Sequence, residues 1–229
     1  MSGAAVPGWA PRAPLSLEPM AGRAVRLERL APDHAPGLHA ALVGAGANWD
    51  YLPYGPFDAA GMARWVDWAA AQADPWFFAT LVDGKPLGVA SYLRVVPEHG
   101  VAEVGHLNFA PALQGTFAAT EALTLMAQRV FDAGYRRYEW KCNALNLASR
   151  RAAQRMGFSY EGVFRQHMVV KGRNRDTAWF AITDADWPTL RMAYKTWLDR
   201  ANFDAEGRQR LSLSLLTRPL LVARDPGLD

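Results

Sequence analysis

The chain has 229 residues, half of them hydrophobic, which suffices for the core of one large or two small globular domains. Its formal net charge is only +3 and it has no lysine-rich tract, so we expect no nucleic-acid partner. The single cysteine, Cys142, excludes an intrachain disulfide, and no stretch approaches the ~18 continuous apolar residues of a membrane helix, so we expect a cytoplasmic protein without membrane contact.

The N-terminal part of the chain predicts an arm, a strand and two helices. Residues 1–22 are rich in Pro, Ala and Gly and have no period, which indicates a mobile N-terminal arm or a strap across the surface. Residues 24–30 alternate as a strand does. Helices are predicted over residues 32–43 and 58–72, and Asp58 is a suitable N-cap for the second.

The middle of the chain predicts a mixed α/β domain. Two strands meet at Asp83-Gly84, a pair typical of a tight hairpin turn, and strands then alternate with helices before a last hairpin. This order favours a twisted sheet with helices on both faces. The predicted strands cover residues 76–82, 87–95, 102–109, 137–142, 162–170 and 177–182, and the predicted helices cover residues 117–133 and 145–156.

Beyond this domain, residues 184–200 have apolar side chains at helical spacing and predict one more helix. The remaining residues to position 229 form an extension. We expect helix and extension to pack on the same domain, covering a sheet edge or forming a homodimer contact.

One stretch indicates a phosphate site. The strand ending at Phe109 leads through a small-residue loop, residues 111–116, into the helix that begins near Phe117. Unpaired N–H groups at a helix start, together with the helix dipole, can hold a pyrophosphate. Many strand–loop–helix turns share this pattern without binding anything.

The residues of this loop resemble those of the GNAT superfamily of acyl-CoA N-acyltransferases. The segment 114–119 (QGTFAA) resembles the family's acyl-CoA loop, Gln/Arg-x-x-Gly-x-Gly/Ala, except that Phe117 replaces the central glycine. That departure indicates either an ordinary φ at Phe117 or an altered pyrophosphate fit. Residues 119–123, 146–149, 157–162 and 171–176 resemble, in order, motifs of the RimJ/RimL-like subgroup.

The resemblance covers roughly residues 25–182 and implies a GNAT-type twisted, mostly antiparallel central sheet in a domain of residues 23–183. It implies an N-acetyltransferase that uses acetyl-CoA as acyl donor, needs no metal, and acts by direct ternary-complex transfer. The acceptor would be a primary amine of a small molecule or of a protein N-terminus. A noncatalytic acyl-CoA-binding or regulatory module is the alternative, because Phe117 departs from the motif and the tyrosine acid of many members is replaced by Ala153.

The resemblance also implies the residues that bind the donor. Backbone groups after the strand would pair with the pantetheine arm, the loop would hold the pyrophosphate, and one helix start would contact the pantetheine amide. These residues are Leu107, Asn108, Phe109, Gln114, Gly115, Thr116, Phe117, Ala118, Ala119, Thr120, Asn146 and Ser149. Arg150, Arg151 and Arg155 are candidates for the 3′-phosphate of CoA, whereas Arg173 and Arg175 are expected to be surface charges.

Amine acetylation needs a base for the amine and an acid for the leaving thiolate. Glu103 matches the base of the histone-acetylating branch, and His106 is its rival because an unperturbed histidine has a pKa near 6.5. The acid of many members is a tyrosine at the position of Ala153 here, so the subgroup's serine, Ser149, is the candidate. Glu103 and His106 also have structural explanations, an ion pair and a packed ring.

The loop 48–57 is rich in aromatic residues. Because helices near this position flank the substrate cleft in the family, Trp49, Tyr51 and Tyr54 are candidates for acceptor binding. Their alternative role is packing between helices.

Overall fold

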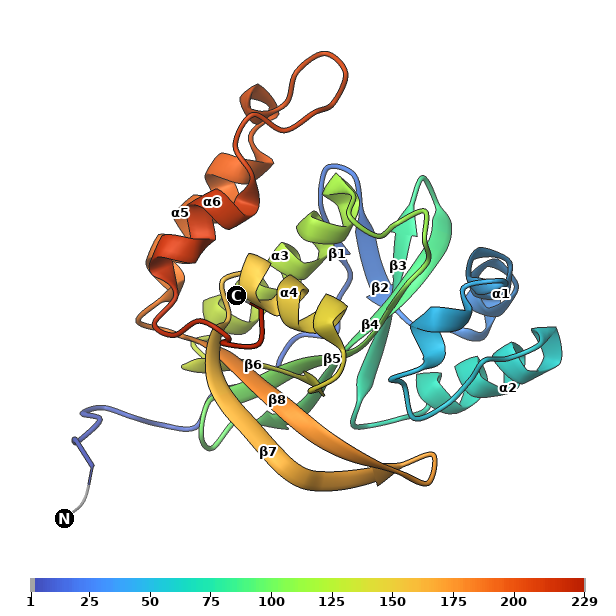
Figure 1. Cartoon of the computed structure of the whole chain (residues 1–229), viewed down its shortest axis with the longest axis horizontal. Coiled ribbons are helices and arrows are strands. Elements are labelled where there is room, and N and C mark those ends of the chain that lie inside the picture. Colours follow the sequence, from blue (N-terminus) through green and yellow to red (C-terminus); the bar gives the residue numbers. More distant parts are fainter. Residues whose placement is uncertain (1–2, 229) are drawn as a thin grey trace.

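The computed structural model describes residues 3–228 and contains one eight-stranded sheet (Figure 1). The spatial order of the strands is β1-β2-β3-β4-β5-β6-β8-β7. Only β5 and β6 are parallel, so the mostly antiparallel α/β fold is confirmed. The strands are β1 Met20–Ala21, β2 Arg26–Arg29, β3 Trp76–Val82, β4 Lys85–Val96, β5 Val101–Phe109, β6 Arg137–Asn143, β7 Ser159–Val170 and β8 Arg173–Thr183.

Helices cover both faces of this sheet, as predicted (Figure 1). One face carries α1 and α2, and the other carries α3, α4 and the C-terminal helices. Helix α2 begins where Asp58 accepts a hydrogen bond from the Gly61 N–H, at 2.7 Å, which is the predicted N-cap. The helices are α1 Ala35–Leu42, α2 Ala59–Ala70, α3 Phe117–Asp132, α4 Leu147–Arg155, α5 Trp187–Leu198 and α6 Leu213–Thr217.

Alternation along the strands divides the core into two layers. Phe77 and Phe78 are adjacent in β3, and both are fully buried. Phe77 packs among Leu38 and Val66 under α1 and α2, whereas Phe78 joins the cluster under α3 and α4. Successive side chains of a strand point to opposite faces, so one short apolar run supplies both layers.

The Asp83-Gly84 turn joins β3 to β4 as predicted. Both residues have positive φ, +48° and +74°, which is the backbone that a two-residue type I′ hairpin turn requires. The last hairpin is longer than the sequence indicates, because β8 starts at Arg173 directly after the turn Lys171-Gly172.

Residues near the N-terminus lie across the domain. The Trp9 indole N–H donates to the Glu98 carbonyl, and the Tyr135 hydroxyl donates to the Ala13 carbonyl. Leu15 is 3% exposed within the main core cluster. Glu121 of α3 accepts the N–H groups of Arg23 and Ala24 at 2.8 and 2.7 Å, which fixes the chain just before β2.

The C-terminal segment packs against α3 and α4 (Figure 1). Helix α5 buries Leu190, Tyr194 and Trp197 against the domain. After α6 the chain returns over α4, where the fully buried Asp225 forms an ion pair with Arg150. Within the described residues, no helix is long and apolar enough to cross a membrane.

Candidate active site

The sheet opens between β5 and β6, and this opening creates the site. The two strands pair only as far as Val104 and Trp140, and beyond these residues no bridge joins them. On its other side β5 has an irregular register with β4, and His106 there has a φ of +50°. Such a bulge bends a strand and redirects its side chains. Two cavities occupy the opening.

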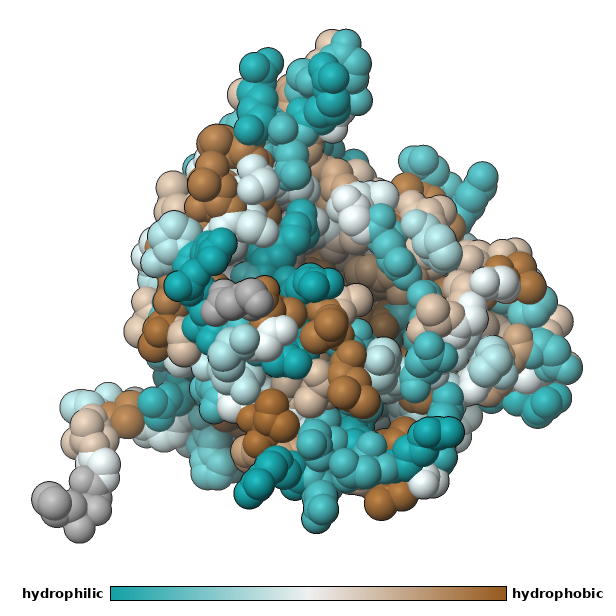
Figure 2. Space-filling model, viewed as in Figure 1, coloured by the Kyte–Doolittle hydropathy of each residue, from teal (hydrophilic) through white to brown (hydrophobic). Residues whose placement is uncertain are grey.

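The larger of these two, about 570 Å³, lies between the end of β5 and the starts of α3 and α4. Leu107 and Phe109 line it from β5, Ala119 and Leu123 from α3, and Ala152 from α4. The space-filling view shows this face hollowed near its centre, with apolar side chains in the depth of the hollow (Figure 2). The apolar walls of this cavity, which end at the loop before α3, suit an uncharged arm attached to a phosphate.

The loop before α3 has the geometry expected of an anion site. Gly115 has a φ of +71°, a conformation that favours glycine. The Thr116 hydroxyl accepts the Ala119 N–H at 3.2 Å and caps the helix. The N–H groups of the rest of the first turn have no partner within the helix and are available to an anion.

Gln114, the first residue of the loop motif, holds the loop in place. Its amide N–H groups donate to Asn48 Oδ1 at 2.9 Å and to the Phe109 carbonyl at 2.8 Å. Asn48 in turn donates to the side-chain oxygen of Asn108 and to the Phe109 carbonyl. The Asn108 side chain is therefore buried as a brace and does not line either cavity.

Phe117, the residue that departs from the motif, points out of this cavity. Its ring stacks on Trp197 of α5, with 5.6 Å between centroids, and meets the edge of Phe203 at 5.4 Å. Ala118 is buried in the core cluster, whereas Thr120 lines the cavity. The large side chain thus leaves the helix start open.

The second cavity, about 210 Å³, lies on the other side of the opening, and charged side chains converge on it. It shares Asn48, Tyr51, Leu107, Trp140, Asn146 and Ser149 with the first cavity, so the two cavities meet at these residues. Its charged lining residues are Arg94, Glu103, Lys141 and Arg175, and its other titratable lining residues are Tyr51, His106 and Cys142.

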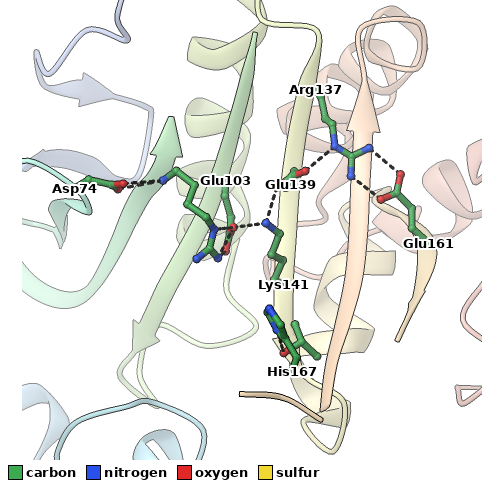
Figure 3. A network of polar contacts seen from close by, with 9 residues as sticks. Asp74, Glu103, Arg137, Glu139, Lys141, Glu161 and His167 are labelled. Atoms are coloured by element: carbon green, nitrogen blue, oxygen red, sulfur yellow. Dashed lines mark hydrogen bonds and ion pairs between the residues drawn. The ribbon is translucent and has the colours of Figure 1, made fainter. Parts of the chain in front are cut away.

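Glu103 is the centre of a row of ion pairs across the sheet (Figure 3). Arg94 donates to both of its carboxylate oxygens at 2.7 Å, and Lys141 Nζ lies 3.0 Å from one of them. Lys141 continues to Glu139, and Arg137 links Glu139 to Glu161. Burial raises the pKa of Glu103, and the charges of Arg94 and Lys141 oppose that rise. Both oxygens already have cationic partners.

His106 packs between aromatic rings at the edge of the same cavity. Its Nδ1 lies 2.9 Å from the Tyr54 hydroxyl, and its ring stacks on Tyr54 and contacts Phe77. Burial, with smaller contributions from Arg94 and Arg175, lowers the pKa of His106 to about 4. The ring is therefore neutral near pH 7, and when Nδ1 donates to Tyr54, Nε2 is free to accept a proton.

The low pKa of His106 predicts a loss of stability in acid. Between pH 6.5 and 4 the unfolded chain binds a proton at this residue and the folded chain does not, so stability falls as pH falls. From pH 7 to 5 we expect His106 to account for a loss of roughly 2 kcal/mol. Urea unfolding at both pH values should show a smaller loss for His106→Asn, and an equal loss in both proteins would contradict the shift.

Ser149 lies where the two cavities meet. Its hydroxyl accepts the Trp140 indole N–H at 3.0 Å, and its backbone N–H donates to the Asn146 side chain, which caps α4. Nearby Cys142 is 6% exposed, and burial raises the pKa of its thiol to about 11. Cys142 is therefore a neutral thiol, whereas Ser149 keeps a hydroxyl at the junction.

Some aromatic residues of the loop 48–57 line the site, and others are buried in the core. Tyr51 lines both cavities, and its hydroxyl donates to the Leu145 carbonyl. Trp49 is 3% exposed and packs on Phe57 in the core, so its side chain does not reach the acceptor side. Tyr54 lies behind His106 and contacts the site only through that ring.

The sequence analysis missed several residues of the site. No local sequence pattern indicated a role for Arg94, Lys141 or Asn48, because each contacts residues on other elements of the fold. Arg175, expected to be a surface charge, lines the second cavity instead. Among residues 3–228, no group of three His, Cys, Asp or Glu side chains is arranged to hold a metal ion.

The open βαβ unit, with a helix start at the opening and two cavities that meet there, suits the transfer of a group between two bound substrates. Comparisons with known proteins identify the family. The acetyltransferase (GNAT) domain matches residues 24–159. The crystal structure of a GCN5-related N-acetyltransferase from Brucella melitensis is 44% identical, with a TM-score of 0.90 over 93% of this chain and 100% of that chain. This chain belongs to the GNAT acetyltransferase family.

Two further solved structures extend the comparison. A probable GNAT-family acetyltransferase from Chromobacterium violaceum ATCC 12472 is 39% identical, with a TM-score of 0.77 over 82% of this chain and 97% of that chain. The microcin C7 self-immunity acetyltransferase, solved with acetyl-CoA and AMP, is 20% identical with a TM-score of 0.63 over 71% and 93%, a likeness of fold alone. Comparison with curated protein sequences gave no match.

Proposed function

We propose that this acetyltransferase uses acetyl-CoA to acetylate a primary amine in a direct ternary complex. The proposal rests chiefly on one observation: two cavities meet at Ser149. One cavity is apolar and ends at the loop before α3, and the other is lined by titratable side chains. The first would hold the pantetheine arm and the thioester, and the second the amine. We also propose a cytoplasmic location and the RimJ/RimL-like subgroup, which rest on the sequence alone.

In the proposed reaction the amine nitrogen attacks the thioester carbonyl, and the carbon–sulfur bond then breaks. His106 is the candidate base because it lines the amine's cavity and its ring is neutral near pH 7, although the burial that lowers its pKa to about 4 makes it a weaker base than a free imidazole. Tyr54 would position the ring through Nδ1. Glu103 is less suited, since Arg94 and Lys141 occupy both of its oxygens.

The leaving thiolate needs a proton or a hydrogen bond. The Ser149 hydroxyl lies at the junction and already accepts from Trp140, so its own proton can point toward the sulfur. Asn146 and the first turn of α4 hold that hydroxyl in place. We therefore propose Ser149 as the acid. The alternative, a noncatalytic module, rested on Phe117 in the loop and on Ala153 in place of the acid tyrosine. The Phe117 ring points toward Trp197, and Ser149 would replace the tyrosine as the acid.

The charge of the second cavity favours an acceptor that carries an anionic group beside its amine. Arg94 and Lys141 are neutralised by Glu103 and Glu139, but Arg175 has no ion pair among the described residues. Its buried Nε atom also has no hydrogen-bond partner. A carboxylate or phosphate on the acceptor would satisfy this guanidinium.

A panel of small amines, with and without a carboxylate or phosphate, tests both parts of the proposal. CoA release should require an amine and should be fastest for anionic members. Arg175→Gln is expected to raise KM for those members about tenfold, the value of one charge-assisted hydrogen bond. Arg173→Gln, exposed on the same hairpin, is the matched control and should change nothing. An equal preference for neutral amines would reject the anionic acceptor.

A further inference from the structure

Helix α4 carries Asn146 and Ser149 at its start, yet the core of the domain holds this helix weakly. Of its nine residues, all within the described part of the chain, only Ala153 is buried. So short a helix is marginally stable by itself and depends on packing against other parts of the fold. The position of Ser149 therefore depends on the contacts that other segments make with α4.

The C-terminal tail, residues 221–228, supplies such contacts. The Ala223 carbonyl accepts the N–H of Tyr160, at the start of β7, at 3.0 Å. On α4, the side-chain oxygen of Gln154 accepts the N–H of Asp225 at 3.0 Å. The tail is therefore fixed to the sheet on one side and to the helix on the other (Figure 1).

Asp225 is the buried anchor of this tail. Both of its carboxylate oxygens accept from the guanidinium of Arg150, and the bond from Nε measures 2.7 Å. Arg150, a sequence-based candidate for the 3′-phosphate of CoA, is thus occupied by a carboxylate of its own chain. Its remaining terminal nitrogen donates to the Ala144 carbonyl at 2.7 Å. One guanidinium therefore joins the tail to the loop between β6 and α4.

That loop determines where α4 begins. Asn146 ends the loop and caps the helix, and its side chain accepts the Ser149 N–H at 3.0 Å while its carbonyl accepts the Arg150 N–H at 3.0 Å. A bidentate carboxylate–guanidinium pair fixes distance and orientation together. Without Asp225, Arg150 would no longer hold the Ala144 carbonyl in one place, and the Ser149 hydroxyl would shift relative to the reacting sulfur. Displacements of about 1 Å are enough to slow a catalysed step severely.

We propose that Asp225 is a positioning residue for acetyl transfer, because through Arg150 and the Ala144 carbonyl it holds the Ser149 hydroxyl at the junction of the two cavities. The inference rests on the proposed function, in which Ser149 protonates the leaving thiolate. Asp225 lines neither cavity and lies outside the matched acetyltransferase domain, residues 24–159. The C-terminal tail thus contributes to catalysis without contacting either substrate.

A double-mutant cycle between Asp225 and Ser149, measured as kcat with a reactive amine, tests this proposal. Asp225→Asn should lower kcat about tenfold in the wild-type background but less than about twofold in Ser149→Ala, where the hydroxyl that it positions is absent. The Kd for acetyl-CoA and the KM for the amine should change by less than about threefold. Asp132→Asn, which breaks the exposed ion pair with Arg191 between α3 and α5, is the matched control and should leave kcat unchanged.

A second variant keeps the test valid if Asp225→Asn fails to fold, since that change leaves the largely buried Arg150 without its carboxylate. Arg150→Met/Asp225→Asn leaves no unpaired charge and also removes the bond to Ala144. It should retain the wild-type circular dichroism spectrum and show the same loss of kcat, again only where Ser149 is present.

The other outcomes overturn the inference at different steps. An equal loss of kcat with and without Ser149 would show that Asp225 does not act through this hydroxyl. Unchanged kcat in the folded double variant would show that the tether is not needed. Wild-type kcat in Ser149→Ala would reject the acid and the positioning role together, while leaving acetyl-CoA use intact. Absence of transfer to any amine by the wild-type protein would instead reject the proposed function itself.

Discussion

Replacing Ala119 with Glu is expected to raise the Kd for acetyl-CoA at least about a hundredfold. Ala119 lies in the first turn of α3 and lines the 570 Å³ cavity proposed to hold the pantetheine arm. A carboxylate at this position would occupy part of the cavity and would repel the pyrophosphate. Because Ala119 is 7% exposed, circular dichroism and urea unfolding of the variant are measured alongside its affinity to verify that it folds. Isothermal titration measures the effect.

Two variants separate the causes of that loss. Ala119→Gln has nearly the same size without the charge, so it should weaken binding by less than Ala119→Glu. Ala112→Glu places the same charge on an exposed residue of the same loop, outside the cavity, and should bind almost normally. Wild-type affinity in Ala119→Glu would mean that acetyl-CoA does not pass the start of α3.

Substitutions of the two candidate bases are expected to change different quantities, kcat for His106 and stability for Glu103. His106→Asn should lower kcat by about a hundredfold or more, because it removes the base while Asn tolerates the positive φ of this residue. Glu103→Gln should chiefly lower stability, by about 1–2 kcal/mol, because it leaves the half-exposed Arg94 without its carboxylate and leaves the buried Lys141 with Glu139 alone. Steady-state kinetics and urea unfolding of both variants give the comparison.

Glu139→Gln is the control for the loss of stability predicted for Glu103→Gln. Glu139 also pairs with Lys141, but it does not line the second cavity, so its loss should affect stability without changing kcat. If Glu103→Gln instead folds normally and loses about a hundredfold in kcat, while His106→Asn stays active, the base is Glu103.

The sequence predicted most of the fold because local chemistry decides it. Asp58 caps α2 and Asp83-Gly84 forms a type I′ turn, both as predicted. Each of these features depends on neighbours within a few residues. The mostly antiparallel sheet with helices on both faces agrees with the family resemblance.

The site was predicted only in part because its contacts are distant in sequence. The loop before α3 and Ser149 belong to local motifs, and both line the larger of the two adjoining cavities. The partners of Glu103 come from β4 and β6, and no local pattern indicated them. Trp49 illustrates the reverse error, since aromatic density alone does not distinguish a buried ring from a cleft-lining ring.

Phe117 is the clearest case in which the sequence could not decide. In the acyl-CoA loop motif Phe117 replaces the central glycine, and this replacement alone suggests that the loop before α3 is closed to a pyrophosphate. Its partners Trp197 and Phe203 follow about 80 residues later in the chain. Only the packed extension explains why a large side chain is tolerated at this position.

The most direct test of the account measures the initial rate of CoA release while acetyl-CoA and a reactive amine from the panel are both varied. Transfer across two cavities that meet at Ser149 requires both substrates to be bound together, so double-reciprocal plots should intersect, and no acetylated enzyme should form with acetyl-CoA alone. Parallel plots with a covalent acetyl-enzyme, or binding of acetyl-CoA without transfer to any amine, would contradict it.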